Sequence, residues 1–145
     1  MHDLPRQLTV EQLADLFEGR TRLVELLAER DDPLGAAPGV IADLSEDEKL
    51  EALNAHPAVG ARNLSARSAG EQGADADPVV LTELAYLNQV YEEKFGFRFV
   101  VFVDRRPKTE ILRVLRERLE RSREEELQTA LDELVAIALD RWKRR

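Results

Sequence analysis

The chain has 145 residues, and 21 Lys and Arg against 29 Asp and Glu give it a formal net charge of −8. So acidic a chain has no general affinity for nucleic acid or anionic lipid, and we expect neither as a partner. It contains no cysteine, which excludes disulfides, thiol nucleophiles and cysteine-ligated zinc. No apolar run approaches the roughly 20 residues of a membrane span, and the N-terminus lacks signal-peptide features, so a cytoplasmic protein is predicted. The length suits a single domain, 1–145.

Two capping boxes predict helices in the first third of the chain. The first pairs Thr9 with Gln12, and the second pairs Ser45 with Glu48. Between them, residues 31–39 contain two prolines and two glycines and are typical of a turn. Apolar residues at helical spacing accompany these signals: Leu13, Leu16, Phe17, Leu23, Leu26, Leu27, Leu50 and Leu53.

Two segments of the middle of the chain lack helical periodicity. Residues 55–78 are rich in Ala, Gly, Ser and Asp and have no clean period, and an irregular stretch of that length is often functional. Residues 95–103 are dense in β-branched and aromatic side chains and are predicted to be extended and buried.

Three further helices are predicted in the second half. Pro78 begins a long helix that runs to Lys94, Pro107 begins another, and Ser122 with Glu125 caps the last. One extended segment cannot form a sheet. The sequence therefore predicts an all-α fold, a compact bundle of about six or more helices with an irregular loop and one short extended, buried segment.

His56 is one of only two histidines and stands directly before Pro57, which disfavours a helical conformation at residue 56. A histidine held at a helix end before a glycine-bearing loop could act as a general acid or base. From the residue alone, the favoured alternative is a satisfied or merely exposed histidine at the end of a helix.

Glu71 and Gln72 follow Ser68 in the irregular stretch. In one interpretation, Ser68 caps a short helical start while Glu71 and Gln72 face a pocket. In the other, Ser68 and Glu71 form an ordinary capping box, which would leave the carboxylate less available to a substrate.

Arg141 lies seven residues after Leu134 and four after Ile137, which places it on the apolar stripe of the last helix. A guanidinium there needs an anion or several acceptors, because burying it unpaired is costly. If it faces a ligand, its replacement should change thermal stability little. Alternatively, the helix frays and Arg141 joins the basic tail 143–145, which complements the helix dipole.

The other charge clusters are predicted to be solvated helix faces with pairs four residues apart. They are the run 124–126 and the arginines Arg116, Arg118, Arg121 and Arg123. The sequence shows no nucleophilic triad, no Gly-rich phosphate loop and no metal-ligand spacing, so no metal site is predicted.

Several of these residues belong to motifs whose order and spacing resemble those of the 2-oxo-4-hydroxy-4-carboxy-5-ureidoimidazoline (OHCU) decarboxylases of urate breakdown. The similarity covers most of the chain from about Leu50 onward and, more loosely, the N-terminal helices. The motifs that carry it are His56-Pro57 with Gly60 and Arg62, Ser68-Ala69-Gly70-Glu71-Gln72, Asn88 and Tyr91, Phe95-Gly96-Phe97-Arg98-Phe99-Val100-Val101, Lys108-Thr109-Glu110-Ile111-Leu112, Leu119, Glu126-Leu127 and Ile137-Ala138-Leu139-Asp140-Arg141-Trp142.

The resemblance implies an all-α carboxy-lyase, usually a homodimer, that converts OHCU to (S)-allantoin and carbon dioxide in purine catabolism. It implies no metal and no organic cofactor. It places the catalytic histidine at His56, the site carboxylate at Glu71 and the site arginine at Arg141. It places substrate contacts at Pro57, Ser68, Gln72 and the backbone of Phe99, Val100, Val101, Phe102 and Val103.

The chain departs from the family pattern at a few positions. Ala58-Val59 stand where the family commonly has Asp-Leu, Arg98 replaces the proline of its Phe-Gly-Phe-Pro-Phe motif, and the loop from His56 to Glu71 is shorter than in many members. These departures bear on pocket shape and dimer contacts. They leave two alternatives: a non-enzymatic helical interaction module on the same scaffold, and a lyase or hydrolase acting on another small ureido compound.

Overall fold

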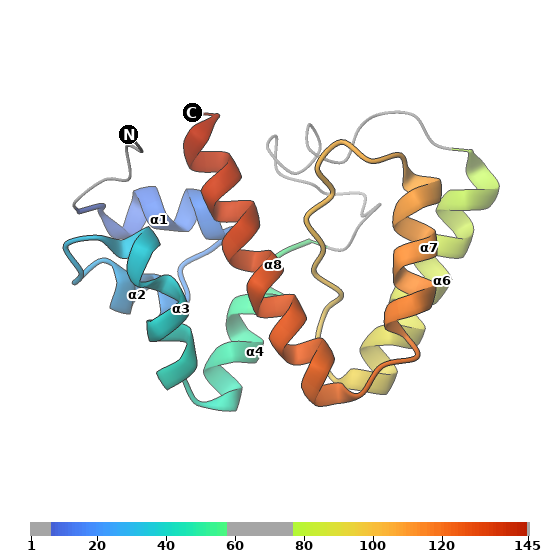
Figure 1. Cartoon of the computed structure of the whole chain (residues 1–145), viewed down its shortest axis with the longest axis horizontal. Coiled ribbons are helices and arrows are strands. Elements are labelled where there is room, and N and C mark those ends of the chain that lie inside the picture. The colour runs from blue at the N-terminus through green and yellow to red at the C-terminus, as the bar shows by residue number, and fades with distance from the viewer. Residues whose placement is uncertain (1–6, 58–76, 145) are drawn as a thin grey trace. The chain divides into compact units, whose positions relative to one another are not determined.

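The computed structural model describes residues 7–57 and 77–144, which form seven α-helices and no β-strand (Figure 1). The prediction of an all-α fold is confirmed for these residues. None of their helices is both long and apolar enough to cross a lipid bilayer. The helices are α1 (Val10–Phe17), α2 (Arg22–Leu27), α3 (Pro33–Asp43), α4 (Glu46–Asn54), α6 (Pro78–Phe95), α7 (Lys108–Arg118) and α8 (Arg123–Lys143).

The chain divides into two compact units. The first comprises residues 1–56 and 131–145, and the second comprises residues 57–130. The helix α8 therefore contributes to both units, with the change at Leu131. That residues 1–145 form a single functional domain stays a prediction.

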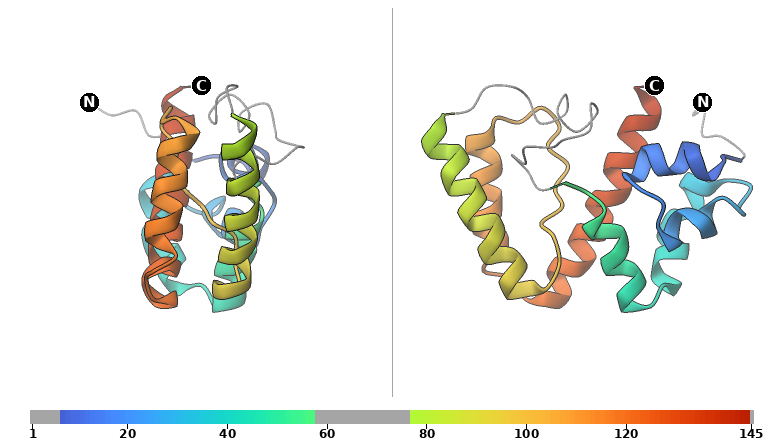
Figure 2. Two further views of the ribbon diagram at one scale, coloured as in Figure 1. Left: turned by 90° about the vertical axis from the view of Figure 1, so that its right-hand side faces the viewer. Right: turned by 180° about the vertical axis from the view of Figure 1, so that it is seen from behind.

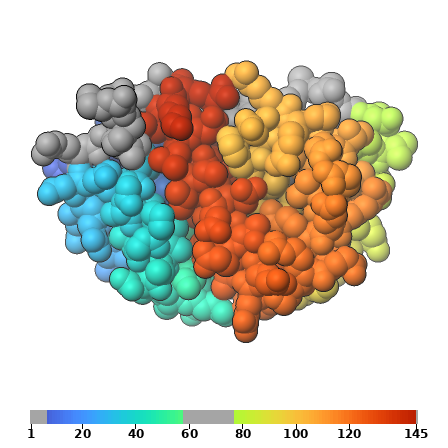
Figure 3. Space-filling view, viewed as in Figure 1, coloured from blue at the N-terminus to red at the C-terminus, as the bar shows by residue number. Residues whose placement is uncertain are grey.

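Local capping explains where α1 and α4 begin, as predicted. The Thr9 hydroxyl accepts a hydrogen bond from the Gln12 amide at 3.1 Å, and the Gln12 side chain accepts one from the Thr9 amide at 2.9 Å. Ser45 and Glu48 make the same reciprocal pair at 3.2 and 2.9 Å. The first unit buries apolar faces from all four of its N-terminal helices, and α2 adjoins α3 on the face shown in Figure 3.

The turn predicted over residues 31–39 is wrong for residues 33–39, which form the first part of α3, and Asp32 is the N-cap of this helix. The Asp32 carboxylate accepts a hydrogen bond from the Gly35 amide at 3.1 Å. Pro33 occupies the first turn, where its missing N–H is not needed. Pro38 lies inside the helix and costs it a backbone hydrogen bond, which burial of the apolar face offsets. The buried residues of α3 are Pro33, Leu34, Ala37, Val40 and Ile41.

In the second unit, α6 and α7 pack side by side and run in the same direction (Figures 1 and 2). Parallel neighbours need a connection that returns the chain to the end where the first helix began. Residues 96–107 form this connection, and an extended chain covers the length of the 18-residue α6, about 27 Å, with few residues. The predicted extended, buried segment is confirmed. Its buried side chains are Phe97, Phe99, Val100, Val101 and Val103.

Predicted start signals for the later helices are also confirmed. Pro78 is the first residue of α6, and Asp77 caps that helix by accepting from the Val79 amide at 2.8 Å. Ser122 and Glu125 form the capping box of α8, with distances of 3.0 and 3.1 Å. The α6 helix ends at Phe95, and its C-cap Gly96 has a φ of 82°, a left-handed conformation that glycine adopts readily.

Candidate active site

His56 lies just beyond the end of α4, where its amide donates a hydrogen bond to the Leu53 carbonyl at 3.2 Å. The residue is only 5% exposed. A histidine held at a helix end is therefore confirmed, and the alternative of a merely exposed histidine is excluded. Pro57, which follows it, is half-buried.

The C-terminal end of α1 lies against both the end of α4 and the side chain of Arg141 in α8. A Cβ atom on Gly19 would lie 3.3 Å from the Cβ of Ala55, so the chain ends of α1 and α4 pack closely. Glu18, the C-cap of α1, has a φ of 66° and directs its carboxylate to Arg141 of α8. The residue before His56 and the guanidinium of Arg141 both lie against the end of α1.

Arg141 points into the protein, as its helical phase predicts. Its side chain is 2% exposed, and its Nη2 lies 3.2 Å from the Glu18 carboxylate. Its Nη1 donates to the carbonyls of Asp15 and Leu16 at 3.4 and 3.2 Å. These carbonyls belong to the last turn of α1, where helical acceptors lack partners and the dipole is negative.

This environment excludes a frayed helix end at Arg141. It also changes the expectation that replacing Arg141 would alter stability little. The guanidinium joins α8 to the end of α1 through protein groups, and its replacement would take a donor from the half-buried Glu18 carboxylate and from the α1 carbonyls. Arg141 therefore holds the first unit together whatever its role toward a substrate.

The remaining side chains of the predicted site fall in the part of the chain that is not described. Ser68, Glu71 and Gln72 lie outside residues 7–57 and 77–144, and their roles stay predictions. Within those two ranges, no group of three or more His, Asp or Glu side chains is arranged to hold a metal ion.

The predicted substrate-lining positions 99–103 lie in the extended segment of the second unit. Four of their five side chains are buried and Phe102 is half-buried, so the backbone is what this segment can offer a ligand. An extended segment outside a sheet has no neighbouring strand whose N–H groups could donate to its carbonyls. Here arginine side chains donate those hydrogen bonds. Arg118 Nη1 donates to the Val100 carbonyl at 2.9 Å, and Arg106 donates to the carbonyls of Phe102 and Val103 at 2.6 and 3.1 Å.

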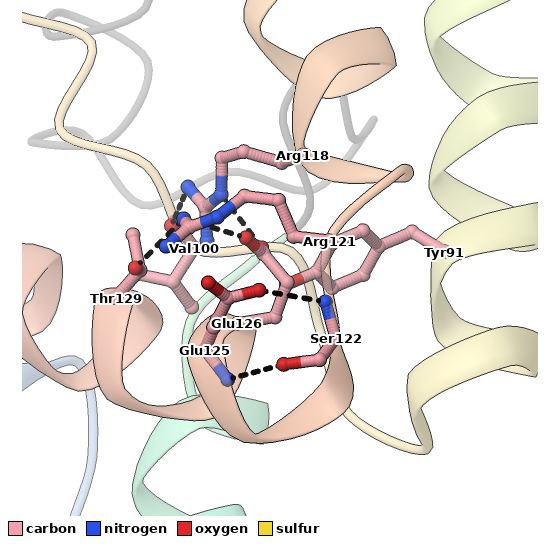
Figure 4. A network of polar contacts seen from close by, with 8 residues as sticks. All are labelled: Tyr91, Val100, Arg118, Arg121, Ser122, Glu125, Glu126 and Thr129. Atoms are coloured by element: carbon pink, nitrogen blue, oxygen red, sulfur yellow. Dashed lines mark hydrogen bonds and ion pairs between the residues drawn. The ribbon is translucent and has the colours of Figure 1, made fainter.

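Behind this segment lies a buried polar network centred on Glu126, which is 0% exposed (Figure 4). Its Oε1 accepts hydrogen bonds from the Tyr91 hydroxyl at 2.6 Å and from Arg118 Nε at 2.7 Å. Its Oε2 accepts one from Arg121 Nη1 at 3.0 Å. Burial, together with the hydrogen bond to Glu126, raises the pKa of Tyr91 far above its ordinary value of 10.0. The Tyr91 hydroxyl therefore stays protonated and donates its hydrogen bond to Glu126.

The prediction of solvated faces is wrong for Glu126 and Arg118. Glu126 lies four residues before Ala130 and eight before Leu134, both buried, and so falls on the apolar stripe of α8. Arg118 follows Leu115 by three residues on the corresponding stripe of α7. The helical phase that predicted an inward Arg141 would have predicted that both side chains also point inward.

Arg98, which replaces a proline of the family motif, is part of the described segment. Its Nε lies 3.5 Å from the Glu92 carboxylate of α6, and its side chain is 30% exposed. The substitution therefore adds an ion pair between the extended segment and the helix before it.

The family model described as OHCU decarboxylase matches residues 2–143, and the chain belongs to this family. Among its relatives, the 2-oxo-4-hydroxy-4-carboxy-5-ureidoimidazoline decarboxylase of Halalkalicoccus jeotgali is 33% identical over 108 residues. That match covers 71% of this chain and 61% of the relative, so the chain spans less than two thirds of that protein's length. The decarboxylase of the same name from Haloferax volcanii is 32% identical, over 74% of this chain and 67% of the relative.

A solved structure is also similar over nearly the full length. The crystal structure of OHCU decarboxylase in the presence of (S)-allantoin aligns with a TM-score of 0.76 and 26% identity. The alignment covers 90% of this chain and 94% of that one. The all-helical architecture is thus the architecture of a solved family member.

Proposed function

We propose that this protein decarboxylates OHCU to (S)-allantoin and carbon dioxide in urate degradation. The observation that carries the proposal is the alignment of 90% of the chain with an OHCU decarboxylase structure. A buried histidine at the end of α4, where the resemblance expects the catalytic residue, supports it further.

The reaction suits a site that contains no electron-accepting cofactor. OHCU has a ring C=N beside the carbon that carries both the hydroxyl and the carboxylate, and this bond accepts the electron pair left when carbon dioxide departs. The enzyme therefore has no electron sink to supply. His56 takes the proton of the substrate hydroxyl and assists delivery of a proton to one face of the neighbouring carbon, which sets the S configuration.

Different polar groups of the proposed site contact different parts of the substrate. Glu71 and Gln72 suit the ureido and ring N–H and C=O groups, which are directional donors and acceptors. Ser68, Pro57 and the backbone of residues 99–103 complete the substrate contacts. Each of these assignments is supported by the resemblance of the motifs.

Arg141 is assigned to a ring or ureido oxygen whose negative charge grows as the carboxylate leaves. Clamping the departing carboxylate would stabilise the substrate more than the transition state and would slow the reaction. The pairing with Glu18 at 3.2 Å supports the assignment, because it gives the guanidinium one fixed direction.

We propose further that the chain works as a single domain, as a cytoplasmic homodimer and without metal or organic cofactor. The family resemblance supports these proposals.

The function is tested by making OHCU from urate in situ with urate oxidase and hydroxyisourate hydrolase. Circular dichroism then follows the appearance of (S)-allantoin with and without this protein. We expect a rapid rise in the signal only with the protein, because protonation in water has no preferred face. Equal signals with and without it would contradict the proposed function and leave the interaction module or another ureido substrate.

A further inference from the structure

Arg118 divides its guanidinium between two partners. Its Nε donates to Glu126 Oε1 at 2.7 Å, and its Nη1 donates to the Val100 carbonyl at 2.9 Å. The guanidinium carbon also lies 4.7 Å from the centroid of the Phe99 ring. The same side chain therefore holds two consecutive residues of the extended segment.

Glu126 is the fixed end of this arrangement. Its carboxylate is fully buried and accepts hydrogen bonds from Tyr91 and Arg118 on one oxygen and from Arg121 on the other. Three charge-assisted or short hydrogen bonds leave it one orientation. The position of the Glu126 carboxylate thus determines where the Arg118 fork points.

A contribution to folding stability does not by itself explain why these charged side chains are buried. The desolvation of two buried charges consumes most of their attraction, and well-packed apolar residues of similar volume often stabilise a fold equally well. An apolar pair would, however, leave the Val100 carbonyl without its donor. The planar fork of arginine serves both the carboxylate and the carbonyl, which the ammonium of lysine cannot do with the same geometry.

We propose that Arg118 is a positioning residue for the decarboxylation, and that it sets the peptide plane between Val100 and Val101. Because a peptide is planar, a fixed Val100 carbonyl also fixes the direction of the Val101 amide. The proposal rests on the proposed function, in which the backbone of residues 99–103 contacts OHCU. A displacement of about 1 Å in a group that orients the substrate is enough to slow the reaction.

The test compares Arg118→Lys with Arg113→Lys, the same substitution on the same helix. The Arg113 side chain is 56% exposed, and its ion pairs, with Glu110 and Glu117, lie within α7. We expect Arg118→Lys to raise KM for OHCU roughly tenfold, the effect of about one hydrogen bond to a charged group. Arg113→Lys should leave KM unchanged. Equal KM values in both variants and the wild type would overturn the proposal.

Amide hydrogen exchange over residues 99–103 provides a readout that does not depend on activity. It should be faster in Arg118→Lys and unchanged in Arg113→Lys; unchanged exchange in both would mean that Arg118 does not hold the segment. If the wild-type protein had no activity on OHCU, the proposed function would fail, while the exchange would still decide whether Arg118 positions the backbone. If Arg118→Lys does not fold, the double variant Arg118→Gln, Glu126→Gln replaces it, since it leaves no unpaired charge buried.

Discussion

Among the described residues, two arginines are buried against carboxylates, and each also donates hydrogen bonds to a backbone carbonyl. Arg141 pairs with Glu18 and reaches the last turn of α1, and Arg118 pairs with Glu126 and reaches Val100. A buried guanidinium needs partners for several N–H groups. Carbonyls at a helix end and in an extended segment outside a sheet supply them.

Replacing Arg141 should therefore affect both activity and stability. We expect Arg141→Lys to lower activity at least tenfold and to lower the free energy of unfolding by about 1–3 kcal/mol, because the lysine ammonium cannot serve Glu18 and the α1 carbonyls together. Arg144→Lys is the matched control, since the Arg144 side chain is 43% exposed and pairs with Asp140 at 2.9 Å. Activity assays and thermal denaturation measure the two effects. Equal, negligible changes in both variants would show that the buried contacts of Arg141 contribute nothing.

The proposed proton transfer depends on His56. We expect His56→Ala to lower kcat by roughly 10²–10⁴-fold, the usual contribution of a general acid or base, while the far-ultraviolet circular dichroism of the fold is retained. His2→Ala removes the other histidine of the chain and should leave kcat unchanged. Near-full activity in a folded His56→Ala variant would rule out this mechanism.

In the second unit, the parallel direction of α6 and α7 explains the extended segment that connects them. Because α6 and α7 run in the same direction, the connection between them is extended, and its carbonyls need donors from outside any sheet (Figure 2). The arginines of α7 and of the connections meet this need. Arg123, the first residue of α8, makes a similar bond just before the connection, from its Nε to the carbonyl of Phe95 at the end of α6, at 2.8 Å. The helix α8 begins beside these arginines, at the capping box of Ser122 and Glu125.

That capping box makes the stability of α8 depend on pH. Hydrogen bonds from the Ser122 amide, and then from its hydroxyl, lower the pKa of Glu125 below its ordinary value of 4.5. A carboxylate with a lowered pKa contributes stability above about pH 4.5 and loses it as the pH falls through the pKa of the folded state. We expect the stability advantage of the wild type over Glu125→Gln to shrink between about pH 6 and pH 3, measured by urea unfolding.

Glu124→Gln removes a neighbouring charge of the same helix end and serves as the control for this comparison. Its difference from the wild type should vary less with pH, because the capping bonds of Ser122 are made by Glu125. A pH-independent advantage over Glu125→Gln would mean that the capping carboxylate is not the source of the acid sensitivity.

At the scale of the whole chain, the composition and the proposed chemistry both lead us to expect activity without a bound metal ion. The chain has two histidines and no cysteine, and the proposed substrate contains its own electron sink. We expect activity to survive exhaustive dialysis against a chelator, with metal content followed by elemental analysis. Loss of activity on dialysis, with recovery on adding back one metal ion per chain, would require a different role for Glu71.

Local signals in the sequence were sufficient for most of the helices and for the direction of Arg141. Capping boxes, helix-starting prolines and apolar spacing involve residues three or four positions apart, so they act in the same way in any fold. The extended segment at residues 95–103 was predictable for a similar reason, because β-branched and aromatic side chains disfavour a helix locally. The α3 helix was missed because Asp, Pro and Gly serve both in turns and at helix starts.

The partners of the buried charges were decided by the tertiary structure. Arg141 bonds to a carbonyl 125 residues away in the sequence, and the Tyr91 hydroxyl bonds to a carboxylate 35 residues away. Helical phase shows that a charged side chain points inward, but the group that it meets depends on which elements pack against it. The sequence alone therefore predicted an inward arginine on α8, and only the folded chain paired it with Glu18 and placed Arg118 between Glu126 and the backbone of Val100.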